Sequence, residues 1–131
     1  MKKIAFGLFV SDMDISVRFY QEVLKLKANW DGGPYADFII EDTYQIMLYK
    51  RSNFEEMIAQ KPEYPVKVNG TMELALDYPG FTDVDKEFER IIQLGATPVL
   101  EPTTTLWGQR TSFLADPDGN LIEIGSFGKN D

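Results

Sequence analysis

The two halves of the chain show the same order of predicted elements, and this repetition restricts the fold more than any other feature of the sequence. Alternating apolar residues predict one strand before a helix and three strands after it in each half. The predicted strands cover residues 4–10, 27–30, 36–41 and 44–50, then begin again at residue 70 and cover residues 97–100, 110–115 and 121–126. Both halves therefore have the order β-α-β-β-β, which indicates an internal duplication.

Each predicted helix follows the first strand of its half. Apolar residues recur at helical spacing in the first half, at Ile15, Phe19, Val23 and Leu26. Residues 11–14 offer N-cap side chains for this helix, whereas in the second half Asp83 is the predicted N-cap and Gly95 the predicted stop. Asp12 and Asp83 are thus predicted to mark the same place in the two halves.

These elements predict an α+β fold made of two tandem βαβββ modules that form a curved mixed sheet around a cavity. The modules cover about residues 1–52 and 70–131, and a linker over about residues 53–69 contains two prolines and a predicted short helix. At 131 residues the chain is long enough to build a sizeable core. We therefore expect a single domain over residues 1–131.

Composition excludes several functions. The formal net charge of −8 argues against a nucleic-acid partner, because a phosphate backbone requires a basic surface. The chain has no histidine and no cysteine, which excludes thiol nucleophiles and removes the commonest metal ligand, so we expect no metal and no cofactor. It also lacks an apolar run long enough for a signal peptide or a membrane span, which predicts a cytoplasmic protein without membrane contact.

The last predicted strand brings a carboxylate to the wall of the cavity expected from this fold. It follows the turn sequence of residues 116–120, in which Gly119 can adopt a positive φ. If Ile122 and Ile124 face the core, Glu123 points the opposite way. Glu73, on the first strand of the second half, is predicted to reach the same concave face.

Short motifs in both halves occur in an order and at a spacing that one family shares. They are Val10-Ser11-Asp12, residues 16–20 and Val23-Leu24 in the first half, and Leu94-Gly95-Ala96, Glu101-Pro102, residues 107–110 and residues 116–123 in the second. In these motifs the chain resembles the vicinal oxygen chelate superfamily, which includes glyoxalase I, extradiol dioxygenases, fosfomycin-modifying enzymes and bleomycin-resistance proteins. The resemblance covers nearly the whole chain.

The resemblance also implies where a metal would bind. The metal-dependent members hold a divalent ion through four side chains, and the corresponding positions here are Ala5, Met47, Thr71 and Glu123. A methyl group, a thioether and a hydroxyl replace three of the usual ligands, whereas a divalent ion needs several oxygen or nitrogen donors. Even with Glu73 added, two carboxylates make a poor site. We therefore expect metal-dependent chemistry of this family to be absent.

Seven further residues are candidates for ligand binding: Phe9, Trp30, Phe38, Met47, Tyr49, Trp107 and Arg110. Trp107 lies in a polar loop, residues 103–108, where it is suited to stack on a flat or cationic ligand. The same loop resembles the Trp-Gly-x-Arg segment of bleomycin-resistance proteins. For Phe38 the alternative is ordinary core packing, and for Met47 it is gap filling.

Arg110 and Glu123 each have a second interpretation. Arg110 either anchors an anionic ligand group or forms a bridge to Asp116 or Glu101, and Glu123 is either a binding carboxylate or a solvated acid paired with Arg110. The sequence alone leaves these alternatives open.

The leading hypothesis is a metal-independent protein that binds and sequesters a small cationic or aromatic molecule, as antibiotic-resistance proteins of the bleomycin type do. The alternative is an enzyme of the same fold, lyase-like or isomerase-like, that uses Glu123 or Glu73 as a general base. A third reading is a regulatory or subunit-contact role with a vestigial cavity. The resemblance further implies a homodimer.

Overall fold

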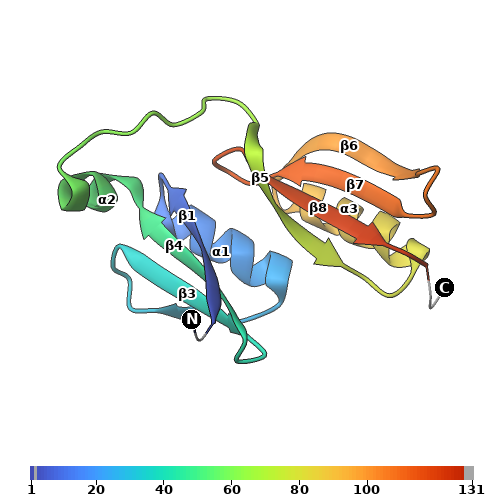
Figure 1. The fold of residues 1–131 in the computed structure, drawn as a ribbon, viewed down its shortest axis with the longest axis horizontal. Coiled ribbons are helices and arrows are strands. Elements are labelled where there is room, and N and C mark those ends of the chain that lie inside the picture. The colour runs from blue at the N-terminus through green and yellow to red at the C-terminus, as the bar shows by residue number, and fades with distance from the viewer. Residues whose placement is uncertain (2, 129–131) are drawn as a thin grey trace. The chain divides into compact units, whose positions relative to one another are not determined.

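The computed structural model describes residue 1 and residues 3–128, and the chain divides into two compact units, Met1–Tyr64 and Pro65–Asp131 (Figure 1). Unit 1 contains β1 (Ile4–Val10), α1 (Met13–Leu24), β2 (Asn29–Trp30), β3 (Tyr35–Ile40), β4 (Tyr44–Lys50) and α2 (Arg51–Ile58). Unit 2 contains β5 (Asn69–Asp77), α3 (Phe81–Gln93), β6 (Thr97–Thr104), β7 (Arg110–Ala115) and β8 (Asn120–Ser126).

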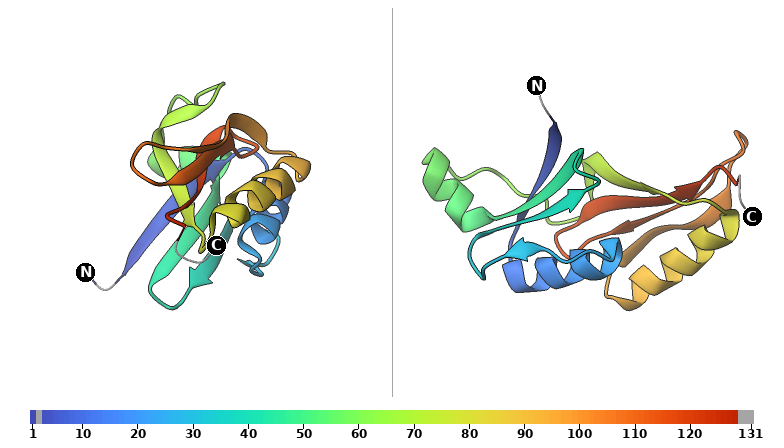
Figure 2. Two further views of the ribbon diagram at one scale, coloured as in Figure 1. Left: turned by 90° about the vertical axis from the view of Figure 1, so that its right-hand side faces the viewer. Right: turned by 90° about the horizontal axis from the view of Figure 1, so that it is seen from below.

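Each unit is a βαβββ module with a four-stranded mixed sheet. The strand order is β1-β4-β3-β2 in unit 1 and β5-β8-β7-β6 in unit 2, with one parallel pair in each, β1 with β4 and β5 with β8. α1 and α3 each lie along one face of the sheet of their own unit (Figure 2). The predicted α+β fold of two tandem βαβββ modules is confirmed. We call the opposite face of each sheet its open face.

The side chains of each strand alternate between the two faces of the sheet, and the core of each unit lies between the helix and the sheet. In unit 1, Phe38 and Leu48 are fully buried on the helix side, together with Tyr20 of α1. In unit 2, Ile122 and Ile124 of β8 are fully buried on the side of α3, as the strand pattern predicts. Within the described residues, no helix is long and apolar enough to cross a membrane.

The predicted buried face of the first helix is confirmed at Phe19 and Val23 and is wrong at its two ends. Ile15 and Leu26 are exposed, at 54% and 39% of their surface, whereas Met13, Ser16 and Val17 are buried. The Asp12 side chain accepts a hydrogen bond from the Ile15 backbone N–H at 3.0 Å, so the helix begins at Met13, and it ends at Leu24, before Leu26.

The predicted N-cap of the second helix is also corrected. α3 begins at Phe81 with Gly80 as N-cap, and the Asp83 carboxylate accepts a hydrogen bond from the Gly80 backbone N–H at 2.9 Å. Asp83 is therefore the third helical residue, where a carboxylate completes a capping box. It does not correspond to Asp12, which is an N-cap.

The turn before the last strand is closed by a buried carboxylate. Asp116 is 4% exposed, and its Oδ1 accepts hydrogen bonds from the backbone N–H groups of Asp118 and Asn120, both at 2.9 Å. The Asn120 side chain donates to Asp116 Oδ2 at 3.0 Å. Gly119 has a φ of 87°, and a Cβ added there would lie 2.7 Å from the Lys67 carbonyl oxygen. The turn thus fixes both the start of β8 and the approach of the segment that leads into β5.

We expect Gly119→Ala to destabilise the protein by at least about 2 kcal/mol, because an alanine is strained at a positive φ and its Cβ overlaps with the Lys67 carbonyl oxygen. Gly95→Ala is the matched control, since Gly95 has a φ of 102° and a Cβ there meets nothing within 4 Å. It should cost about 1 kcal/mol. Urea unfolding of both variants measures the difference, and equal losses would contradict the role assigned to the contact with Lys67.

Candidate functional site

Glu123 lies on the open face of unit 2, where it is half-buried. Its neighbour across the antiparallel pair with β7 is Phe113, and across the parallel pair with β5 it is Ala75. Both neighbours are apolar, so the polar partners of the carboxylate come from diagonal positions on the two adjacent strands.

Glu73 is one of these diagonal partners. It pairs in register with Leu121, two residues before Glu123, and its side chain shares the open face because strand residues alternate. Partial removal from water, a side-chain hydrogen bond with Glu123 and the negative charge of Glu123 all raise the pKa of Glu73. Glu123 thus raises the pKa of Glu73, which the sequence predicted on the same face, and we call these two residues the carboxyl pair.

Thr111 and Gln109 complete the surroundings of Glu123. The buried Thr111 hydroxyl donates to Glu123 Oε2 at 2.6 Å, and the Gln109 side-chain amide donates to the same oxygen at 3.4 Å. The other end of the Gln109 amide accepts a hydrogen bond from the Trp107 indole N–H at 3.0 Å. A continuous polar chain thus leads from the indole in the loop to the carboxyl pair in the sheet.

The Trp107 loop itself is a closed turn. The Thr105 hydroxyl donates to the Gln109 carbonyl oxygen at 3.0 Å, and the Thr105 backbone N–H donates to that same oxygen at 2.8 Å. The Trp107 side chain remains 70% exposed. The loop therefore presents an aromatic surface to solvent while its base is fixed to the sheet.

This arrangement does not fit a divalent metal. Within the part of the chain that the structure describes, no three histidine, cysteine, aspartate or glutamate side chains lie close enough together to hold one. Oε2 of Glu123 is already an acceptor for Thr111 and Gln109, and Glu73 is the carboxyl group beside it. A metal site here would need further oxygen or nitrogen donors, which the in-register neighbours of Glu123, Phe113 and Ala75, do not supply.

Arg110 lies on the other side of the sheet. It pairs in register with Ser126 and shares the helix side with the buried Ser112, and its guanidinium binds Asp85 of α3 through two hydrogen bonds of 2.6 and 2.7 Å. These hydrogen bonds lower the pKa of Asp85 and raise that of Arg110. The partner is thus Asp85, and neither Glu123, Asp116 nor Glu101 as considered from the sequence.

The open face of unit 1 carries three of the predicted residues. Alternation places Phe9, Met47 and Tyr49 on it, and the ring of Phe54 from α2 stacks on Phe9 with centroids 4.0 Å apart. The Tyr49 ring meets Phe54 edge-on at 6.4 Å. These side chains form an aromatic cluster at the end of the face where α2 begins.

Trp30 and Phe38 are placed on the helix side of unit 1. Phe38 is fully buried in the core, and Trp30 pairs in register with the fully buried Ala36. The Trp30 indole N–H donates to the Gly33 carbonyl oxygen at 2.8 Å, which ties it to the turn after β2. Neither side chain lies on the open face.

Sequence reasoning missed a second carboxylate network, centred on Asp37. This residue pairs in register with Met47 on the open face of unit 1, and its carboxylate accepts hydrogen bonds from the side chains of Gln45 at 2.6 Å, Asn29 at 2.8 Å and Tyr35 at 3.2 Å. Burial and the neighbouring Asp37 charge raise the pKa of Tyr35. The period-two pattern of residues 35–40 was the signal that could have revealed Asp37.

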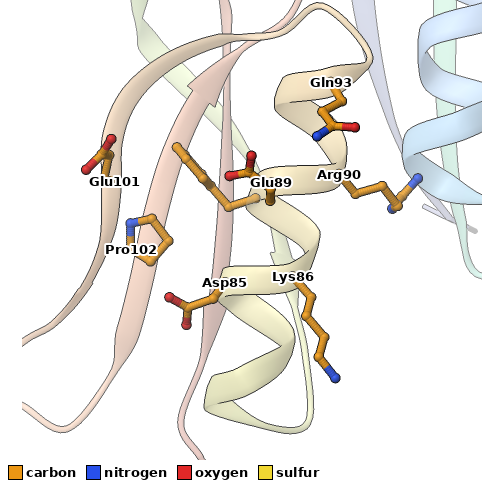
Figure 3. A pocket seen from close by; sticks show the side chains of 8 residues that line it. Asp85, Lys86, Glu89, Arg90, Gln93, Glu101 and Pro102 are labelled. Carbon is orange, nitrogen blue, oxygen red and sulfur yellow. The ribbon is translucent and has the colours of Figure 1, made fainter.

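An open groove lies on the helix side of unit 2, between α3 and β6 (Figure 3). Its lining residues are Asp85, Lys86, Phe88, Glu89, Arg90, Gln93, Glu101 and Pro102. Most of them are charged, and two form ion pairs within the unit, Arg90 with Glu87 at 2.6 Å and Asp85 with Arg110. Glu73 and Glu123 do not line this groove, so it is separate from the carboxyl pair.

The two βαβββ modules and the carboxylate on the final strand define the class of protein. Residues 4–124 match the model of the Glyoxalase/Bleomycin resistance protein/Dioxygenase superfamily, and the chain belongs to this superfamily.

Individual relatives share the fold over most of their length. The chain is 29% identical over 127 residues to the uncharacterized protein YraH of Bacillus subtilis (strain 168), which covers 95% of this chain and 97% of YraH. A glyoxalase-related enzyme from Fulvimarina pelagi superposes with a TM-score of 0.82 at 20% identity, covering 96% of this chain and 88% of that one. The fosfomycin resistance protein FosX from Listeria monocytogenes superposes with a TM-score of 0.70 at 18% identity, covering 94% and 90%. At these identities the two solved structures show a shared fold.

We expect Glu73→Gln to change how stability depends on pH. The folded-state pKa of Glu73 is raised, so its contribution to stability is complete below the unfolded-state pKa and is lost as pH rises through the folded-state value. The variant should therefore gain stability relative to the wild type as pH rises above about 4.5. Because Glu73 is exposed to solvent, the gain is limited to about 1 kcal/mol or less.

Urea unfolding of both proteins between about pH 4 and about pH 8 measures this difference. Glu101→Gln, which removes an acid from the helix side of the same unit, is the control and should show no such divergence. A difference between Glu73→Gln and the wild type that stays constant over this range would show that the carboxyl pair is not coupled.

Proposed function

We propose that the protein is a metal-independent small-molecule binding protein of the sequestration or resistance type, and that unit 2 takes a cationic ligand with a flat apolar part. The observation that carries the proposal is the coupled pair of Glu73 and Glu123 on the open face, connected to an exposed tryptophan. Binding of this kind requires affinity alone and no catalytic step. On the family resemblance, we also propose that it acts as a homodimer in the cytoplasm.

The chemistry of the pair favours a cation with N–H donors. At neutral pH two neighbouring carboxyl groups repel each other, and a cation placed beside them relieves that repulsion. An N–H donor on the cation forms charge-assisted hydrogen bonds, which are stronger than neutral ones. The net charge of −8 adds a long-range attraction for the same kind of ligand.

Trp107 supports the apolar part of the ligand. Its ring is largely exposed, yet its N–H is fixed to Gln109, so the ring face offers a stacking surface without a large loss of freedom on binding. Phe113, opposite Glu123 in register, adds a second apolar surface beside the carboxylate.

A second candidate function is an enzyme in which Glu73 acts as a general base. The raised pKa of Glu73 favours it, because a base whose pKa approaches the working pH transfers protons efficiently. In this case Glu123, held by Thr111, would tune Glu73 through its charge. Turnover that is lost in Glu73→Gln but survives in Glu101→Gln would distinguish this function from binding alone.

Benzamidinium and its neutral analogue benzamide test the proposed function by titration calorimetry. We expect benzamidinium to bind and benzamide to bind at least about tenfold more weakly, because only the cation compensates the carboxyl pair. Glu123→Gln should weaken benzamidinium binding by a similar factor, while the control Glu101→Gln should leave it unchanged.

Two results would contradict this function. Equal affinity for the cation and the neutral analogue would show that the carboxyl pair does not contribute to binding. Tight stoichiometric binding of a divalent metal, with turnover of the methylglyoxal–glutathione adduct, would instead assign the protein to the metal-dependent enzymes of the superfamily.

A further inference from the structure

Gly125 of β8 has no side chain, and the side chain of Gln109 occupies the space that this leaves on the open face of unit 2. It follows Glu123 by two residues on β8 and pairs in register with Thr111. A Cβ added at Gly125 would lie 2.9 Å from Gln109 Nε2 and 3.4 Å from Thr111 Oγ1. Its φ is outside the left-handed region, so the backbone itself would accept any residue. Glycine is therefore required at this position because a larger residue would overlap with the Gln109 side chain.

The Gln109 amide occupies that space in a defined orientation. Its carbonyl oxygen accepts from the Trp107 indole N–H at 3.0 Å, and its NH₂ group donates to Glu123 Oε2 at 3.4 Å. An indole nitrogen only donates and a carboxylate only accepts, so the two ends of the amide cannot be exchanged. Glutamine is thus the side chain that satisfies both neighbours at once.

The backbone of Gln109 is fixed as well. Its N–H donates to the Thr105 hydroxyl at 3.2 Å, and its carbonyl oxygen accepts from both the hydroxyl and the backbone N–H of Thr105. The loop that carries Trp107 is therefore closed at its base by the same residue whose side chain reaches the carboxyl pair. Movement of the indole is coupled to the position of this one amide.

We propose that Gln109, seated on Gly125, is the residue that determines ligand specificity at this site. A single amide group separates the indole N–H from the carboxylate, so the distance between the aromatic surface and the negative charge is short and fixed. This favours a cation attached directly to a flat ring, such as an arylamidinium, over a cation on a long flexible chain. The inference rests on the proposed function, because it names the ligand class of the same carboxyl pair.

The variant Gly125→Ala tests whether the packing of Gln109 against Gly125 matters, without disturbing the fold. The atom that the new methyl group meets first is the end of a flexible side chain, so the amide moves aside while the backbone stays in place. Gly70→Ala is the matched control, since it is also a strand glycine and a Cβ there meets nothing within 4 Å. Gln109→Leu removes both amide hydrogen bonds by a different route and should behave as Gly125→Ala does.

The first measurement needs no ligand. In a Trp30→Phe background, Trp107 is the remaining tryptophan, and its time-resolved fluorescence anisotropy reports the mobility of the indole. We expect a larger fast component in Gly125→Ala and in Gln109→Leu, and no change in Gly70→Ala. An indole that is equally mobile in all variants would overturn the role of Gln109.

The second measurement compares two probes by titration calorimetry, benzamidinium and 4-phenylbutylammonium. The parent protein should prefer benzamidinium, and Gly125→Ala and Gln109→Leu should reduce that preference by about threefold to tenfold. A preference that persists although the indole has become mobile would overturn the specificity role alone. If neither probe binds the parent, the specificity role fails together with the proposed function, and the anisotropy result shows whether the amide link itself exists.

Discussion

The hydrogen bonds that Asp116 accepts within its turn determine where β8 begins, and the arrangement of the open face depends on that starting point. Side chains of a strand alternate between faces, so a shift of β8 by one residue would exchange Glu123 with Ile122 or Ile124. The carboxylate of Asp116 accepts from two backbone N–H groups and one side chain of the turn, which leaves little freedom in this register. The buried carboxylate of Asp116 thus helps to keep Glu123 on the open face.

The neighbours of Glu123, the carboxylate on the final strand, do not fit a divalent metal ion. One of its oxygens accepts from Thr111 and from Gln109, which are neutral hydrogen-bond donors. Its carboxyl neighbour is Glu73, whose raised pKa reflects the cost of a second negative charge beside it. In a metal site the ion would carry that cost. Here the hydrogen bonds from Thr111 and Gln109 offset part of that cost, which supports the organic cation proposed as the ligand.

The sequence predicted the strands better than the helices and the contacts between elements. Residues 4–10, 44–50 and 110–115 were predicted to the residue, because alternation in a half-buried strand is a strong local signal. In the first helix Phe19 and Val23 were correctly predicted as buried, whereas Ile15 is exposed and Leu26 lies beyond the last helical residue, Leu24. The ion-pair partner of Arg110 is Asp85, which was not among the acids considered, because ion pairs between distant elements leave no local pattern.

The candidate site shows the same limit. The open face of Glu123 and Glu73 followed from alternation, whereas Gln109 was passed over because its role depends on space above Gly125. A glycine in a strand indicates close approach of another group, so this signal was present in the sequence without naming the group. The Asp37 network was missed for a related reason: its donors come from three separate strands or their ends.

The two units share one backbone plan and carry different chemistry on their open faces. In unit 1 a single aspartate is surrounded by amide and phenol donors. In unit 2 Glu123 raises the pKa of the neighbouring Glu73, and the nearby Trp107 is hydrogen-bonded to Gln109. Residues of the open face alternate with those of the core, so replacing them leaves the packing of Phe38, Leu48, Ile122 and Ile124 intact. Membership of the superfamily therefore fixes the architecture, and the residues that alternate with the core are free to differ in their chemistry.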